Sequence, residues 1–188
     1  MNDKYVFIDR DGVINKDGDG WTRYGYITKW EDFVFLPGVI EAFKSLKEAG
    51  YKSIVISNQK CVGKGIMTAS ELEVLTEKMR ETVLLSGGSI DGVFYCPHLD
   101  EDNCSCRKPK DGLFLIAREK FGIDTFLGKY FIGDSKRDII AGKKAGLKTL
   151  LVLSGKSTRE DAAGWEIKPD NISEDLAGAV KVVIGEGA

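Results

Sequence analysis

Three aspartates, Asp9, Asp11 and Asp134, follow short apolar runs, at positions where buried strands are expected to end. Carboxylates that meet in one crevice repel each other and raise each other's pKa unless a cation lies between them. Oxygen-only ligands favour a hard cation, and Mg²⁺ suits a site that leaves room for waters and a phosphate. The three aspartates therefore predict a magnesium site.

The chemistry that such a site could support is phosphoryl transfer. One carboxylate can attack phosphorus as a nucleophile, and a second can protonate the leaving oxygen and then activate water. The Ser57 hydroxyl and the Lys108 ammonium can hold the phosphoryl oxygens, where the negative charge lies. Asp138 lies four residues after Asp134, on the same helical face, so it could orient Lys108 or a metal-bound water.

Three thiols and one imidazole stand within eleven residues, in the order Cys96, His98, Cys104 and Cys106. This is a complete tetrahedral ligand set for structural Zn²⁺, with no open position for catalysis. The alternatives are reduced cysteines in a surface loop, or a disulfide between Cys104 and Cys106. A disulfide is disfavoured in the cytosol, and a separation of two residues gives poor geometry.

A closed zinc site would fix the loop of residues 96–109, which has little apolar content of its own. It would also direct Arg107 and Lys108 into the crevice. The fourth cysteine, Cys61, is interpreted as an ordinary small residue near the site.

Apolar periodicity predicts strands and helices in alternation. Strands are expected at 5–8, 54–56, 93–95, 130–132 and 150–153. Helices are expected at 38–49, 72–83 (after a Thr68–Glu71 capping box), 113–121, 136–145 and 174–184. Continuous rather than alternating apolar strands indicate an α/β fold, a parallel sheet with helices on both faces. In such sheets the ligand crevice lies beyond the carboxyl ends of the strands, where the predicted site residues stand.

The 188 residues are expected to form a single domain (1–188) with the 96–109 loop inserted after the third strand. Apolar residues make up 43% and charged residues 30%, which excludes a disordered chain. The net charge of −2 gives no basic footprint for nucleic acid, and no apolar run reaches the ~20 residues of a membrane span. We expect a cytoplasmic protein, since the first residues lead directly into a strand without a signal-peptide pattern, and we also expect a monomer.

Four motifs resemble those of the haloacid dehalogenase-like (HAD-like) phosphatases. Residues 7–15 (Phe-Ile-Asp-Arg-Asp-Gly-Val-Ile-Asn) resemble the first motif and residues 57–59 (Ser-Asn-Gln) the second. Lys108 resembles the third motif and residues 133–138 (Gly-Asp-Ser-Lys-Arg-Asp) the fourth. All four occur in the family's order, each after an expected strand.

The resemblance implies a Rossmann-like sandwich and assigns roles to individual residues. Asp9 would be the nucleophile and Asp11 the general acid and base. Asp9, Asp134 and the backbone carbonyl of Asp11 would hold Mg²⁺. Asn58 and Gln59, in the second motif, are predicted to contact the substrate.

The cysteine–histidine loop resembles a zinc-binding subgroup of this family without a large cap domain. The subgroup contains D-glycero-D-manno-heptose 1,7-bisphosphate phosphatases and histidinol-phosphate phosphatases. Residues 26–40 and 63–65 resemble the heptose enzymes. Two features depart from them: the insert between His98 and Cys104 is short, as in the histidinol-phosphate enzymes, and Ser135 stands where a basic residue is common.

In this subgroup Arg107 would contribute to substrate recognition. The polar loop with Asp17, Asp19 and Gly20 stands where the distal groups of the substrate are contacted, although such a sequence is also typical of a mobile, solvated turn.

The leading hypothesis is therefore a Mg²⁺-dependent phosphomonoesterase that acts on a sugar phosphate, best assigned as heptose 1,7-bisphosphate. Histidinol phosphate is the alternative substrate. A phospho-accepting signalling domain, or a zinc-stabilised binding module with an inert acidic site, is an alternative from another class. Residues 155–158 (Gly-Lys-Ser-Thr) resemble the end of a P-loop, but Leu150 replaces the required first glycine, so that interpretation is rejected.

Overall fold

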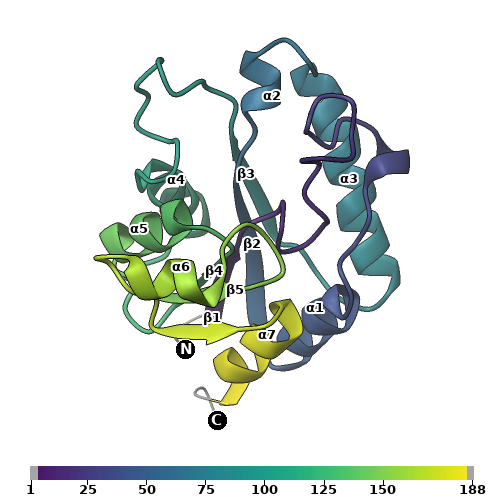
Figure 1. Ribbon diagram of the computed structural model, residues 1–188. Helices are drawn as coiled ribbons and strands as arrows, with labels where there is room; N and C mark the ends of the chain where they lie inside the picture. The colour runs from purple at the N-terminus through teal and green to yellow at the C-terminus, as the bar shows by residue number, and fades with distance from the viewer. Residues whose placement is uncertain (1–3, 186–188) are drawn as a thin grey trace.

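A computed structural model describes residues 4–185 and contains one parallel six-stranded sheet. The strands are β1 (Lys4–Ile8), β2 (Tyr51–Asn58), β3 (Gly92–Cys96), β4 (Tyr130–Gly133), β5 (Lys148–Val152) and β6 (Asn171–Ser173). Their order across the sheet is β3-β2-β1-β4-β5-β6, and every neighbouring pair is parallel (Figure 1). The five predicted strands are confirmed, with bounds that shift by up to three residues.

Helices cover both faces of the sheet (Figure 1). They are α1 (Val39–Glu48), α2 (Lys60–Gly63), α3 (Ala69–Leu85), α4 (Gly112–Phe121), α5 (Lys136–Ala145), α6 (Arg159–Gly164) and α7 (Leu176–Gly185), with a 3₁₀ helix η1 (Trp30–Asp32). The apolar sides of α1, α3 and α7 share one core with the sheet, and α4 packs into a second core on the opposite face. The predicted three-layer α/β sandwich is confirmed, and residues 4–185 contain no large cap domain.

The predicted capping box at the start of α3 is present. The Thr68 hydroxyl accepts a hydrogen bond from the Glu71 amide (3.1 Å), and the Glu71 carboxylate accepts one from the Thr68 amide (2.7 Å). These two bonds satisfy amide groups that the first turn of a helix leaves without partners.

Four short elements were not predicted: strand β6, helices α2 and α6, and the 3₁₀ helix η1. Strand β6 has three residues, too few to show a period, and only Ser173 in it is buried. Helix α6 has six residues and begins at a capping box between Thr158 and Asp161, a signal that the sequence carries but that no long apolar stripe follows. It packs through Ala162 against Ile139 and Leu151.

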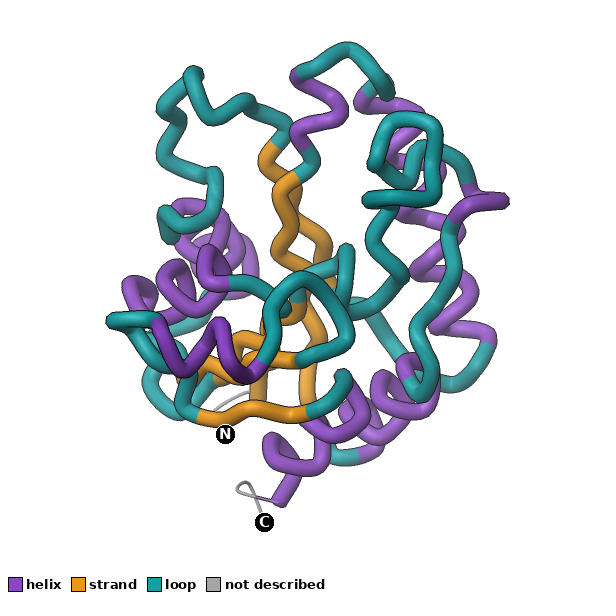
Figure 2. Tube along the Cα trace, in the orientation of Figure 1, coloured by secondary structure: helices purple, strands orange, loops and turns teal. Residues whose placement is uncertain are grey.

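The strand order reverses beside β1, because β2 leads outward on one side and β4 on the other. A crevice at the carboxyl ends of β1 and β4 is therefore the expected ligand position. Figure 2 shows that the segments that follow β1, β3 and β5 are mainly loops. Among residues 4–185, no helix has the length and apolarity of a membrane span.

Candidate functional site

Three carboxylates and one ammonium meet beyond the ends of β1 and β4. Carboxylate oxygens of Asp9, Asp134 and Asp138 lie within 4.8 Å of one another, and all three residues are buried. The Lys108 Nζ lies 2.9 Å from Asp9 Oδ1 and 2.6 Å from Asp138 Oδ1, and donates a hydrogen bond to the Ile56 carbonyl (2.9 Å). The fold thus brings together groups that the sequence separates by up to 129 residues.

The start of α5 positions Asp138. A capping box joins Ser135 and Asp138, in which the Ser135 amide donates to Asp138 Oδ2 (3.0 Å). The other carboxylate oxygen is then directed at Lys108. Gly133 leaves the necessary space, because a Cβ atom there would lie 2.3 Å from the Asp138 Cβ.

Two glycines leave space around Asp134. A Cβ atom on Gly12 would lie 2.4 Å from Asp134 Oδ2, and one on Gly155 would lie 2.1 Å from it. The same oxygen accepts a hydrogen bond from the Lys156 amide (2.8 Å). The loop after β5 therefore packs directly against this carboxylate and fixes its orientation.

The electrostatics of this cluster favour a bound cation. Burial raises the pKa of Asp9 to about 6, with Lys108 opposing the shift. Burial, followed by the charges of Asp138 and Asp9, raises the pKa of Asp134 well above its usual value. Burial alone would lower the pKa of Lys108, but Asp138 and Asp9 raise it above its usual value. Three carboxylates against one ammonium leave negative charge that a divalent cation would offset, so these oxygen donors fit Mg²⁺.

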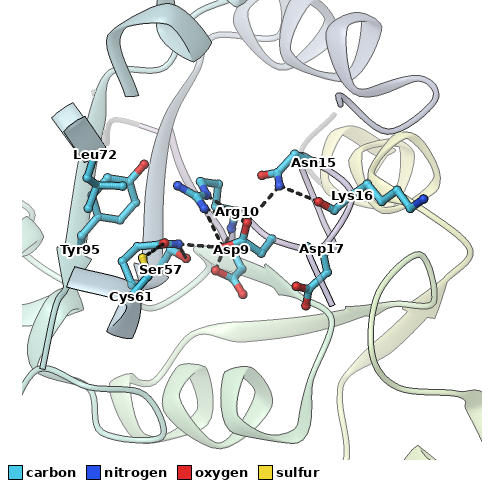
Figure 3. Close-up of polar contacts among 12 residues, drawn as sticks. Asp9, Arg10, Asn15, Lys16, Asp17, Ser57, Cys61, Leu72 and Tyr95 are labelled. Atoms are coloured by element: carbon cyan, nitrogen blue, oxygen red, sulfur yellow. Dashed lines mark hydrogen bonds and ion pairs between the residues drawn. The ribbon is translucent and has the colours of Figure 1, made fainter. Parts of the chain in front are cut away.

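The carboxylate of Asp11 is not part of this cluster and has partners of its own, two of which, Arg10 and Asn15, are labelled in Figure 3. Arg10 donates to it from Nε (3.2 Å) and from Nη2 (2.8 Å), Asn15 donates from Nδ2 (2.9 Å), and Gln59 donates from Nε2 (2.7 Å). Burial would raise the pKa of Asp11, but Arg10 and the hydrogen bonds lower it below its usual value. The side chain of Asp11 is not part of the carboxylate cluster, which leaves its backbone carbonyl as the group to consider for a metal.

The second motif lies at the end of β2, with Ser57 and Asn58 in the strand and Gln59 directly after it, and it lines the same crevice. Ser57 is buried, and its Oγ accepts a hydrogen bond from Gln59 Nε2 (3.1 Å). The Asn58 amide is bonded twice to the backbone of Lys108, as donor to its carbonyl and acceptor from its N–H (both 3.0 Å). Asn58 and Gln59, predicted to contact substrate, thus have protein partners, and Asn58 holds Lys108 in place.

The predicted zinc ligands converge at the base of the loop after β3. The Cys106 Sγ lies 3.3 Å from Cys96 Sγ, 3.5 Å from Cys104 Sγ and 3.3 Å from His98 Nδ1. The Cys96 Sγ lies 3.7 Å from that of Cys104 and 3.6 Å from His98 Nδ1. A tetrahedron with Zn–S bonds of about 2.3 Å has edges of roughly 3.8 Å, so this donor set fits a zinc ion.

A pocket of about 580 Å³ opens over the carboxylate cluster. Its walls include most of the predicted substrate-binding residues: Asp17, Asp19, Asn58, Gln59 and Arg107. Gly20, also predicted to contact substrate, is exposed and not part of the wall.

The pocket wall also includes basic residues that sequence reasoning did not select: Arg10, Lys60, Lys136, Arg137 and Lys156. Lys156 lies in the segment that was rejected as a P-loop, and its Nζ lies 2.9 Å from Asp17 Oδ2. The position of Lys156 could have indicated it. The loop after β5 carries Lys156, and because β5 lies next to β4 in a parallel sheet, this loop begins at the same edge as the site.

Comparisons with known proteins agree with this architecture. A HAD-hydrolase-like family model matches residues 105–179. The D-glycero-beta-D-manno-heptose-1,7-bisphosphate 7-phosphatase of Helicobacter pylori strain J99 is 40% identical over 152 residues, which cover 80% of this chain and 83% of that protein. The enzyme of the same name from Escherichia coli O6:H1 is 36% identical and covers 94% of this chain and 93% of its own.

A similar solved structure is the D,D-heptose 1,7-bisphosphate phosphatase of B. bronchiseptica complexed with magnesium and phosphate. It superposes with a TM-score of 0.88 at 30% identity, and covers 97% of this chain and 99% of its own. Since these relatives match almost the whole chain in sequence and in fold, the chain belongs to the HAD-like phosphatase family, in the group with a cysteine–histidine loop and no large cap.

Proposed function

We propose that the protein is a Mg²⁺-dependent phosphomonoesterase that removes the 7-phosphate of D-glycero-D-manno-heptose 1,7-bisphosphate. The observation that carries this proposal is the contact of Asp9 with Lys108 inside a buried carboxylate cluster at the β1–β4 switch point, where the charges favour a bound cation. The substrate is proposed from the relatives, whose names specify it and which match 80% or more of this chain.

In the first half-reaction, an oxygen of Asp9 attacks phosphorus and the bond from phosphorus to the sugar oxygen breaks. Asp11 would supply the proton to that leaving oxygen, a role that requires its carboxylate to leave Arg10 and Gln59, whose contacts lower its pKa. The Lys108 ammonium and the Ser57 hydroxyl would hold the phosphoryl oxygens, which carry most of the negative charge. Asp138 keeps Lys108 charged and aimed at this position.

In the second half-reaction, water attacks the phosphorus of the aspartyl-phosphate and the bond to Asp9 breaks. Asp11, now deprotonated, would accept the proton from that water. The Asp11 carboxylate lies against Arg10 and Gln59. Its proposed role in both half-reactions therefore requires it to turn from them toward the reacting oxygen. Inorganic phosphate and the unmodified Asp9 complete the cycle.

The metal would be held by Asp9, Asp134 and the Asp11 carbonyl, and would neutralise charge on the phosphoryl group. The cysteine–histidine cluster would hold a structural zinc ion, with no free position for substrate. We propose that zinc orders the loop of residues 96–109, which presents Arg107 and Lys108 to the pocket.

A substrate with two phosphates suits the charge of this pocket. One phosphate would lie at Lys108, and further cations line the wall around it, among them Lys60, Arg107 and Arg137. These side chains could neutralise a second anionic group on the same molecule. Histidinol phosphate carries an ammonium in place of a second phosphate and is less suited to these cations.

A comparison of kcat/KM on heptose 1,7-bisphosphate and histidinol phosphate tests the proposal. We expect continuous phosphate release with Mg²⁺ and at least a hundredfold preference for the heptose substrate. A hundredfold preference for histidinol phosphate would reverse the assignment. A single equivalent of phosphorylated Asp9 without turnover would instead indicate a phospho-accepting signalling domain.

A further inference from the structure

The tip of the cysteine–histidine loop carries an aspartate that joins two arginines. Residues 99–103 lie between His98 and Cys104, two of the predicted zinc ligands. Asp100 Oδ1 in this tip lies 2.7 Å from Arg107 Nε and 3.7 Å from Arg137 Nη1. A single carboxylate oxygen thus connects the loop to the first turn of α5.

Asp100 and Arg107 differ in where they lie. The side chain of Asp100 is 58% exposed and is not part of the pocket wall, whereas that of Arg107 is 7% exposed and lines the pocket. Asp100 therefore contacts the arginine from outside. Any effect of Asp100 on a bound molecule would act through Arg107 or Arg137.

The guanidinium of Arg107 is held at two of its three nitrogens. Nε donates to Asp100, and Nη1 donates to the His98 carbonyl (3.3 Å). Within residues 4–185, no hydrogen bond to protein is found for Nη2. A planar guanidinium fixed in this way presents its remaining donors in one direction, which suits recognition of a phosphate.

The charge of Asp100 also matters for Arg137. Two guanidinium groups near the same oxygen repel each other, and Asp100 offsets that repulsion. The Arg137 side chain is 54% exposed, so without the carboxylate it would be free to extend into water. Arg107 and Arg137 both line the pocket, on the loop and on α5 respectively.

We propose that Asp100 is a positioning residue that holds Arg107, and with it Arg137, for the second phosphate of a bisphosphate substrate. This inference rests on the proposed function and extends it to a residue outside the pocket. Lys108 is held separately, by Ile56, Asn58 and Asp138, so the reacting phosphate is expected to depend little on Asp100.

The test compares Asp100→Ala and Asp100→Asn on two substrates that lose the same phosphate. These are heptose 1,7-bisphosphate and heptose 7-phosphate, which differ only in the 1-phosphate. Loss of one charge-assisted contact predicts about a tenfold rise in KM for the bisphosphate, with kcat within about threefold of wild type. The loss of kcat/KM on the monophosphate should be several times smaller. Asp100→Asn keeps an acceptor oxygen and should fall between wild type and Asp100→Ala.

Glu101→Gln is the matched control. Glu101 is the exposed neighbour of Asp100 in the same tip, and its replacement removes the same charge without touching Arg107. It should stay within about twofold of wild type on both substrates, as surface charges at this distance are largely screened. An equal loss on both substrates in Asp100→Ala would show a merely structural role. A lower KM would show that Asp100 competes with substrate. Either result overturns the proposal.

A second readout tests the contact without substrate. In the metal-loaded protein, the Arg107 Nε–H signal in nitrogen-15 NMR, assigned with Arg107→Lys, should exchange slowly. It should become fast in Asp100→Ala and stay slow in Glu101→Gln. Fast exchange in the wild type would overturn the proposal. If the wild type is inactive on heptose 1,7-bisphosphate while the signal behaves as expected, the proposed function fails and the Asp100 contact stands without its link to a second phosphate.

Discussion

The two clusters of metal-ligating side chains differ in how much of the chain builds them. The cysteine–histidine cluster takes all its donors from the eleven residues 96–106, whereas the carboxylate cluster needs residues from 9 to 138. The first requires only a loop to close on itself, and the second requires β1 and β4 to lie side by side. A local cluster can stabilise a segment, while a long-range cluster reports on the whole fold.

The two clusters also differ in charge and burial. Asp9, Asp134 and Asp138 are all buried and repel one another, while His98, Cys104 and Cys106 are only partly buried or exposed. Buried charges that repel one another are typical of catalytic sites. The more open thiol cluster, with four donors and no free position, is typical of a structural ion. Changes confined to one cluster should therefore leave the other intact.

The largest effect is expected from Asp9→Asn. Removal of the proposed nucleophile should lower kcat by about 10³-fold or more, measured as phosphate release. Zinc content and the unfolding temperature should stay close to wild type, because the amide is isosteric and the cysteine–histidine loop is untouched. Asp124→Asn, at an exposed site that is not part of the pocket wall, is the control and should retain full activity. Full activity in Asp9→Asn would contradict the mechanism.

The next effect is expected from Gly155→Ala. The added Cβ would lie 2.1 Å from Asp134 Oδ2, so the carboxylate must move. A displaced ligand should weaken Mg²⁺ binding about 10- to 100-fold, measured by the Mg²⁺ dependence of phosphate release. Gly164→Ala is the control, since nothing lies within 4 Å of its added Cβ. Equal Mg²⁺ dependence in both variants would show that Asp134 is not a ligand.

Cys104→Ser tests the cysteine–histidine cluster. Loss of one thiolate should remove zinc, measured as metal content after purification, and raise KM about tenfold as the loop loses order. The Mg²⁺ dependence should change little, because Lys108 keeps its bonds to Asn58 and Asp138. Retention of one zinc per chain, or a loss of Mg²⁺ binding equal to that of Gly155→Ala, would argue against two independent clusters.

The smallest effect is expected from Lys156→Ala. Its Nζ pairs with Asp17 at a largely exposed position, and such pairs contribute about 0.2–1 kcal/mol, a factor of at most about fivefold. KM should rise by that factor and the difference should shrink at high salt. Lys144→Ala, an exposed lysine of α5, should match wild type. A loss above a hundredfold would place Lys156 in direct contact with the reacting phosphate.

Much of the fold could be predicted from sequence because the central strands are continuous apolar runs. Strand β1 shows four buried residues in succession, and the polar residue after it, Asp9, marks the edge of the sheet. Strand β6 could not be predicted, since three residues show no period. Which side chains meet at the edge followed from the rule for parallel sheets.

The site was harder to predict where side-chain direction matters. The position of Asp11 two residues after Asp9 does not reveal that its carboxylate turns to Arg10 and Gln59. The second motif likewise predicts substrate contact for Asn58 but does not reveal that its amide is bonded to the backbone of Lys108. These directions depend on neighbours from distant segments, which spacing along the chain does not specify.

The paired bonds between the Asn58 amide and the backbone of Lys108 imply a division of labour within the loop after β3. They join Lys108, the lysine proposed to hold the reacting phosphate, to the end of β2 in the manner of one extra rung of the sheet. Arg107, one residue earlier, has no such attachment to the sheet and depends on the loop tip. Removal of zinc is therefore expected to reduce discrimination between phosphate esters more than the rate of their hydrolysis. Zinc would then affect substrate selectivity more than turnover.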